Sequence, residues 1–250
     1  MTADGVLTGD PAALALLAGE GIRTVADVLA RSEGVRDLPD RSNHRLVTGG
    51  RTFHVKRRKS RRPSPEAAAL LAARAAGVPV PAVSFQGLDA REGSLVGTPD
   101  LSPARPMDDL IREGRLRGEA LGAAFHSLAR AAAALHSARY HHHDLYLNHV
   151  YADPAAASPS VTLIDLERMT GHHGALSGAV VKDLAAVEAS VPEGTTSCRA
   201  RARFLAHYLM ARGFPVRLLL GPLMRRVVRK AEKIRAHVPR TPVGDAARPR

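Results

Sequence analysis

The stretch HHHDLYLNH, residues 141–149, places three histidines directly before an aspartate, Asp144. A second aspartate, Asp165, ends the apolar run VTLID. Phosphoryl transfer to a hydroxyl group needs two such carboxylates, one to orient the attacking hydroxyl and one to bind Mg²⁺. It also needs a cation for the nucleotide phosphates and an acid to hold that cation, and Lys56 and Glu66 supply both types. The residue types therefore indicate phosphoryl transfer.

The three adjacent histidines also suggest a zinc site. Neighbouring side chains point in different directions, however, and zinc ligands need a spacing that lets them converge, as in H-x-x-x-H. We therefore favour a structural role for His142, which would brace the loop that carries Asp144. His141 and His143 are expected to be exposed.

The elements that must position these residues begin with a hairpin. Residues 44–58 contain two β-prone arms joined at Gly49-Gly50, and Lys56 lies near the end of the second arm. Ser64-Pro65-Glu66 has the order of an N-cap, a first-turn proline and a first-turn acid, so a helix is expected from there to Gly77. This order places Lys56 on a strand and Glu66 on the helix that follows it.

The remaining pattern divides the chain into a β-rich half and a helical half. Strands are expected at 78–87 and 94–101, and short helices precede the hairpin at 11–19 and from Thr24. The second half is mainly helical: it has a long alanine-rich helix at 117–137, one short buried strand within 161–169, and helices that include 182–190, 201–213 and 216–237. We expect an α+β fold with two lobes, residues 1–101 and 102–238, and a flexible tail at 239–250.

The order of Lys56, Glu66, His142-His143-Asp144 and Asp165 resembles the protein-kinase-like fold. More narrowly, HHDLYLNHVY followed by LIDLERM is similar to the lipopolysaccharide kinase family, which phosphorylates heptose or Kdo in the lipopolysaccharide inner core. VKDLAAV at 181–187 also resembles a segment of that family. The resemblance covers roughly residues 40–235, and it implies ATP and Mg²⁺ as cofactors.

The resemblance assigns a role to each matching residue. Asp144 would be the catalytic base or the orienting carboxylate, with His142 bracing its loop. Asp165 would be the main Mg²⁺ ligand. Lys56 would contact the α- and β-phosphates, paired with Glu66.

Two parts of the motif depart from the pattern of ordinary kinases. His149 stands where those kinases place an asparagine that binds the second metal ion, although Mg²⁺ prefers oxygen ligands. Either His149 acts indirectly, or Mn²⁺ serves as well, or the neighbouring Asn148 supplies an amide oxygen. In place of a full glycine-rich loop the chain has Gly49-Gly50, which would cover the nucleotide phosphates.

Charge and composition limit the partners. Residues 201–250 hold 13 of the 36 Lys and Arg residues but 2 of the 24 Asp and Glu residues, so the net charge of +12 lies almost wholly in the C-terminal fifth. Such a segment suits an anionic membrane surface or glycolipid, although it could equally be a solvated helix face, and no specific nucleic acid is expected. One cysteine, no recognisable signal peptide and no long apolar run predict a cytoplasmic protein, with peripheral attachment to the inner face of the membrane as a further option.

Together these features predict an ATP-dependent kinase that acts on a sugar hydroxyl of an anionic glycan. Two alternatives stay open: a Ser/Thr/Tyr protein kinase of the same fold, and a pseudokinase that binds a partner without turnover. No Ala-Pro-Glu segment follows Asp165, which argues against a conventional protein kinase.

Overall fold

The computed structural model describes residues 5–156, 158–171 and 174–237. Its N-terminal part contains a six-stranded sheet with the order β1-β5-β6-β4-β3-β2, in which every pairing is antiparallel. The strands are β1 (Thr8–Gly9), β2 (Glu33–Asp37), β3 (Arg41–Thr48), β4 (Arg51–Arg58), β5 (Phe85–Asp89) and β6 (Gly93–Pro99).

The predicted hairpin is formed by β3 and β4. Gly49 and Gly50 join the two strands with φ of 53° and 73°, the positive values that a tight turn of this kind requires. The register pairs Thr48 with Arg51 beside the turn and Asn43 with Lys56 toward the other end. Lys56 therefore lies far along β4 from the glycine turn.

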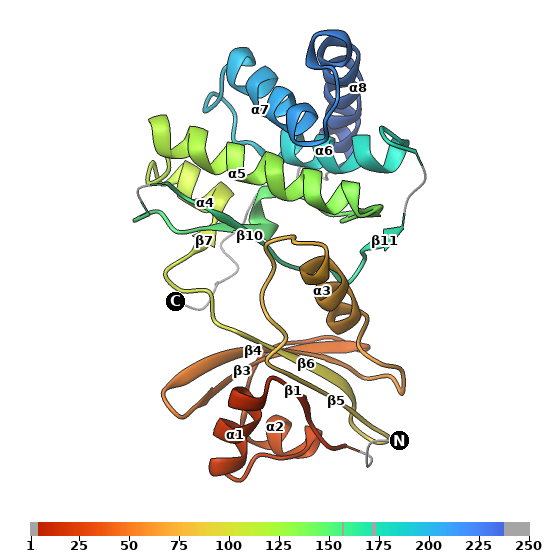
Figure 1. The fold of residues 1–250 in the computed structure, drawn as a ribbon. Coiled ribbons are helices and arrows are strands. Elements are labelled where there is room, and N and C mark those ends of the chain that lie inside the picture. The colour runs from red at the N-terminus through yellow and green to blue at the C-terminus, as the bar shows by residue number, and fades with distance from the viewer. Residues whose placement is uncertain (1–4, 157, 172–173, 238–250) are drawn as a thin grey trace.

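Helices cover both faces of the sheet (Figure 1). Helices α1 (Pro11–Gly19) and α2 (Val25–Arg31) lie on one face, and their apolar side chains share a core with the sheet residues Leu46, Phe53 and Phe85. Helix α3 (Pro65–Ala75) lies on the other face and begins as predicted, because the Ser64 hydroxyl accepts a hydrogen bond from the Ala67 N–H.

The second part of the chain is mainly helical. It contains α4 (Met107–Arg112), α5 (Gly118–Ser137), α6 (Gly178–Ser190), α7 (Cys198–Ala211) and α8 (Val216–His237). Short strands and one 3₁₀ turn lie between these helices: β7 (Arg105–Pro106), β8 (Tyr140–His141), η1 (Leu147–His149), β9 (Val150–Ala152), β10 (Val161–Leu163) and β11 (Thr170–Gly171).

A second hydrophobic core joins these helices to α3. Leu70 and Ala73 of α3 pack in one cluster with Leu135 of α5, Leu163 of β10 and Leu184 of α6. The apolar side of α3 therefore belongs to the helical core, while its first turn lies toward the sheet (Figure 1). This packing brings Glu66, in that first turn, close to the segment that follows β10.

Two expectations about strands need correction, and one strand was not predicted. The strand predicted at 78–87 begins only at Phe85, because Pro79 and Pro81 have no N–H to donate to a neighbouring strand. The strand predicted within 161–169 ends at Leu163, and Asp165 leaves the extended conformation with a φ of 62°. Strand β2 was not predicted, because EGVRD is an exposed edge strand without apolar alternation.

The predicted division into lobes at residue 101 stays a prediction, and the predicted tail at 239–250 lies outside the described residues. The sheet strands end at Pro99, and α4 begins at Met107. Within the described part of the chain, every helix is too short or too polar to cross a bilayer.

Candidate active site

Lys56, Glu66 and Asp165 meet although they come from β4, α3 and the segment after β10. The Lys56 Nζ lies 3.1 Å from Glu66 Oε1 and 2.7 Å from Asp165 Oδ1. Burial acts to lower the pKa of Lys56, but the charges of Glu66 and Asp165 outweigh it and hold the pKa above its usual value. The ammonium group is therefore charged at neutral pH, as a phosphate contact requires.

The two carboxylates respond differently to this cation. Burial raises the pKa of Glu66, against the opposing charge of Lys56. Burial also acts to raise the pKa of Asp165, but the charge and the hydrogen bond of Lys56 prevail and lower it. Asp165 therefore stays ionised, which suits a ligand of a divalent cation.

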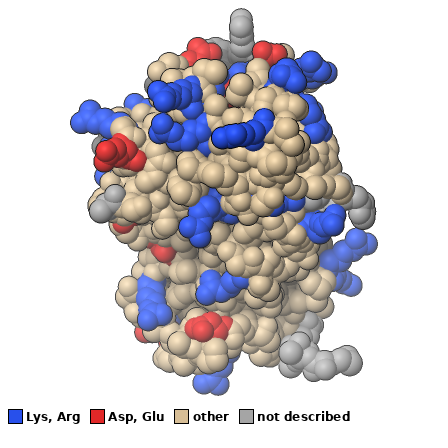
Figure 2. Space-filling view, turned by 45° about the horizontal axis from the view of Figure 1, so that its top comes forward, with Lys and Arg blue, Asp and Glu red and all other residues tan. Residues whose placement is uncertain are grey.

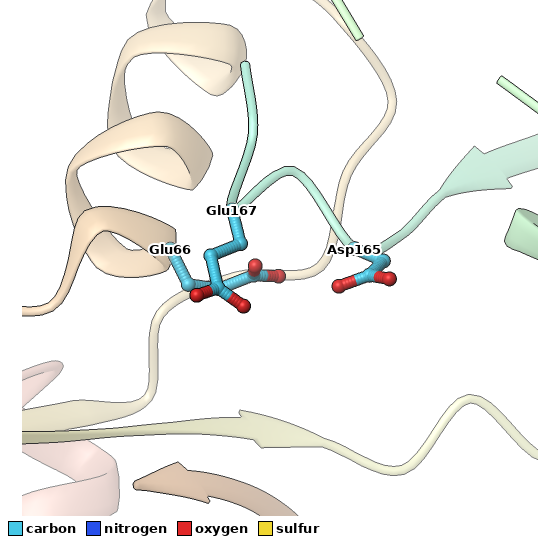
Figure 3. A group of neighbouring side chains, drawn as sticks. All are labelled: Glu66, Asp165 and Glu167. Atoms are coloured by element: carbon cyan, nitrogen blue, oxygen red, sulfur yellow. The ribbon is translucent and has the colours of Figure 1, made fainter. Parts of the chain in front are cut away.

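A third carboxylate, Glu167, lies beside this group (Figure 3). Oxygen atoms of Glu66, Asp165 and Glu167 all lie within 4.8 Å of one another. Glu167 also pairs with Arg58 of β4 and, at 3.4 Å, with Arg41 of β3. Because arginines hold both of its oxygens, Glu167 fastens the sheet to the segment that carries Asp165. Sequence analysis did not predict these contacts of Glu167.

Asp183, a buried residue that the sequence analysis did not assign to the site, holds the backbone of the loop that carries Asp144. Asp183 of α6 is fully buried and accepts the backbone N–H groups of His142 at 2.6 Å and His143 at 2.9 Å. Burial acts to raise its pKa, but these hydrogen bonds and the one from His136 keep the pKa below its usual value. An aspartate amid the apolar residues of VKDLAAV was the available signal.

The support for Asp183 extends to α7. The Asp183 Oδ2 that accepts the His142 N–H also lies 3.2 Å from the His136 Nε2, and the His136 Nδ1 lies 3.0 Å from the Tyr208 hydroxyl. Burial raises the pKa of Tyr208 to about 12, so the hydroxyl keeps its proton and can donate it to His136. Arg212 in turn donates to the Tyr208 oxygen at 2.7 Å.

His142 joins the loop of Asp144 to the segment of Asp165. Its Nε2 lies 2.9 Å from the Ile164 carbonyl oxygen, which can only accept, so this nitrogen carries the proton. Burial lowers the pKa of His142, and the ring is therefore neutral at pH 7. His141 is buried rather than exposed, and its Nε2 contacts the Thr170 hydroxyl at 2.9 Å. The His143 Nε2 contacts the same hydroxyl at 2.8 Å, whereas His142 is turned to the Ile164 carbonyl, so the three histidines do not converge on one zinc ion.

Asp144 and Asp165 open into one cleft between the sheet and the helical part. The cleft is lined by Arg36, Leu38, Arg41, Ser42, Asn43, Lys56, Asp144, Ile164, Asp165, Glu167 and Arg168. The Arg168 guanidinium covers Asp144, with Nη1 at 3.2 Å and 2.9 Å from its two oxygens. Lys56, Asp144 and Asp165 therefore share a single opening.

Of the two candidates for a second metal ligand, His149 faces the site. Its Nδ1 lies 2.8 Å from the Asp144 carbonyl oxygen, which can only accept, so Nδ1 carries a proton and Nε2 is the nitrogen that can offer a lone pair. That Nε2 lies 3.5 Å from Asp165 Oδ2. Two acceptor atoms at this distance fit a divalent cation held between them, and Mn²⁺ accepts nitrogen more readily than Mg²⁺ does. Asn148 is exposed, and it lines neither the cleft nor a second cavity that lies next to the cleft and shares Lys56 and Asp165 with it.

Gly49 and Gly50 are not brought to this cleft. A side chain at Gly49 would strike Leu16 of α1, and neither glycine lines the cleft. The register of β3 and β4 is the reason, because it places the glycine turn and Lys56 toward opposite ends of the hairpin. The residues that line the cleft at its sheet edge come instead from β2, β3 and the turn between them.

A solved structure described as "WaaP in complex with acyl carrier protein" has the same fold, with a TM-score of 0.74 and 25% sequence identity. The alignment covers 91% of this chain and 98% of that chain. This likeness confirms the predicted α+β, protein-kinase-like fold class. No curated protein sequence matches the chain.

A family model described as "Lipopolysaccharide kinase (Kdo/WaaP) family" matches residues 35–208. The matched range contains Lys56, Glu66, the loop of Asp144 and Asp165. Members of this family are phosphotransferases that act on sugar hydroxyls. The chain therefore belongs to the lipopolysaccharide kinase (Kdo/WaaP) family, as its motifs predicted.

Proposed function

We propose that this protein transfers the γ-phosphate of ATP to a hydroxyl of an anionic sugar, such as one in a lipopolysaccharide-core-like glycan. The observation that carries the proposal is the cleft in which Asp144, Asp165 and Lys56 lie together. These are the carboxylates and the cation that phosphoryl transfer uses, and they arrive from segments far apart in the chain.

Within this proposal, Asp144 accepts the proton of the attacking hydroxyl, and Lys56 contacts the α- and β-phosphates. Glu66 holds Lys56, and the neutral His142 holds the loop in place. Asp165 and His149 would bind a divalent cation, Mg²⁺ or Mn²⁺, which would offset the negative charge of the phosphates.

A cavity next to the cleft is suited to the nucleoside. It shares Asn43, Lys56, Ile164 and Asp165 with the cleft, so a molecule that occupies both would pass beside Lys56. Apolar side chains from β2, β4, α3 and β9 line it, together with the residues Thr98–Leu101 that leave the sheet. We propose that the turn between β2 and β3 covers the phosphates, the role expected of Gly49 and Gly50.

The basic C-terminal helix supports a membrane-bound acceptor. Helix α8 buries Leu223, Val227 and Ala231, and its exposed side carries Arg and Lys residues. In Figure 2, Lys and Arg side chains are spread over the helical end of the molecule. We propose that this face approaches the anionic inner surface of the membrane from the cytoplasm.

The test is ADP release with a range of sugar acceptors, ATP and either Mg²⁺ or Mn²⁺, followed by mass spectrometry of the acceptor. We expect phosphate on a sugar, and we expect Asp144→Asn to lower the rate of ADP release by at least about 10²-fold. Phosphate on protein side chains would instead favour a protein kinase. Nucleotide binding with equal, negligible turnover in wild type and Asp144→Asn would favour a pseudokinase.

A further inference from the structure

Arg168 covers the carboxylate that the proposed reaction must use. Its Nη1 contacts both oxygens of Asp144, at 3.2 Å and 2.9 Å. The pair lies in the cleft itself, and the exposed fractions of the two side chains are 64% and 23%. An acceptor hydroxyl that approaches Asp144 would meet the guanidinium first.

The ion pair between Arg168 and Asp144 is weak enough to open when a ligand binds. Water screens a pair of this exposure, and the long arginine side chain loses conformational freedom when it is held in one geometry. Asp183, by contrast, holds the backbone of the Asp144 loop from the buried side through His142 and His143. The loop therefore does not need Arg168 to keep its shape.

The chemistry of arginine indicates what would draw it away. A guanidinium group binds carboxylate and phosphate groups through paired N–H donors, so an anion carried by the acceptor can replace Asp144 as its partner. The other arginines of the cleft, Arg36 and Arg41, belong to the β2–β3 hairpin, whereas Arg168 follows Asp165 on the opposite wall. Arg168 is thus the arginine of the cleft that sits on the catalytic carboxylate.

We propose that Arg168 selects acceptors with a carboxylate or phosphate near the reacting hydroxyl, and that binding of this group uncovers Asp144. This inference rests on the proposed function and adds a specificity residue to it. A neutral sugar or a water molecule leaves the Asp144–Arg168 pair closed, because it gives the guanidinium no competing anion. The device would also limit wasteful hydrolysis of ATP.

The first test measures ADP release by the full chain with ATP and Mg²⁺ and no sugar. We expect Arg168→Gln to raise this basal rate by about 2–5-fold, the range that opening an exposed ion pair allows. The matched control is Arg130→Gln, since Arg130 is an exposed arginine of α5 outside the cleft, and it should leave the rate unchanged. An unchanged or lower basal rate in Arg168→Gln would overturn the proposal.

The second test compares Kdo, which carries a carboxylate, with its neutral methyl ester. Wild type should release ADP faster with Kdo than with the ester, Arg168→Gln should not distinguish them, and Arg168→Lys should retain part of the difference. Equal rates of wild type with the two sugars would overturn the inference while leaving the kinase activity standing. A wild type that releases no ADP under any condition would overturn both.

Discussion

At the scale of single residues, Lys56 balances the charges of Glu66 and Asp165. We expect Lys56→Met to lower ADP release by at least about 10²-fold, because the variant lacks the cation for the phosphates. It should also lower the free energy of unfolding by about 1–2 kcal/mol, since Glu66 is buried and loses its partner while solvent already screens part of the pair. Kinetics and urea unfolding measure the two effects.

The control for that prediction is a double variant. Glu66→Gln in the Lys56→Met background removes the stranded carboxylate, so part of the lost stability should return while the activity stays low. Stability that falls further in the double variant would contradict the view that Glu66 is stabilised mainly by Lys56.

His142 makes the stability of the protein depend on pH. Burial lowers its pKa in the folded chain, whereas the unfolded imidazole takes up a proton below about pH 6.5. The unfolded state therefore binds more protons on acidification, and stability present above pH 6.5 is lost as the pH falls toward the folded pKa. We expect His142→Gln to reduce the slope of unfolding free energy between pH 7 and 5.5, by up to about 1.4 kcal/mol per pH unit. Parallel slopes for variant and wild type would exclude His142 as a contributor.

At the scale of elements, α6 positions the catalytic loop through Asp183. An asparagine there offers one oxygen where the carboxylate offers two, and its amide NH₂ would face backbone donors. We expect Asp183→Asn to lower kcat by about 10²-fold with a smaller change in the KM for ATP, because Lys56 does not contact Asp183. Steady-state kinetics with either nucleotide or acceptor varied would separate the two constants.

The same helix offers a matched control. Glu188 is also buried on α6, but it pairs with Arg201 and Arg235 of the neighbouring helices. Glu188→Gln should therefore cost stability while leaving the kcat of the folded enzyme near the wild-type value. A similar loss of kcat in both variants would mean that α6 acts through general stability rather than through the loop.

The elements also show what the sequence could and could not predict. Lys56, Asp144 and Asp165 could be proposed as site residues because each follows or ends an element with a clear pattern, and the structure brings the three into one cleft. Asp183 was not assigned its contacts, since these depend on how separate segments pack. Gly49 and Gly50 were expected to cover the phosphates because β2 was not predicted. Without that polar edge strand, the glycine turn was the turn that the sequence pattern indicated near Lys56.

At the scale of the whole molecule, the net charge of +12 is concentrated in the C-terminal fifth of the sequence. Helix α8 packs through Leu223 and Val227, which confirms that one side of it belongs to the helical core. Its exposed Arg and Lys residues are Arg217, Arg225, Arg226, Arg229, Lys230, Lys233 and Arg235, of which Arg235 pairs with Glu188. These residues leave a cationic surface that can lie on anionic lipid without unfolding the helix.

We expect wild type to sediment with vesicles that contain anionic lipid and to stay unbound with neutral vesicles. The triple variant Arg225→Glu/Arg229→Glu/Lys233→Glu should bind anionic vesicles about 10²-fold more weakly, since each basic residue near the surface contributes about 1 kcal/mol. Raising the salt should weaken wild-type binding as well, because ions shorten the range of the attraction to below about 10 Å above 0.1 M.

The control variant changes the same charge elsewhere. Arg45→Glu/Arg74→Glu/Arg115→Glu alters three exposed arginines on β3, α3 and the loop after α4. If α8 is the contact surface, this variant should bind nearly as wild type does, because the local potential rather than the total charge determines adhesion. Equal weakening by both triple variants would mean that the protein responds to its net charge alone, and no particular face would then be directed at the membrane.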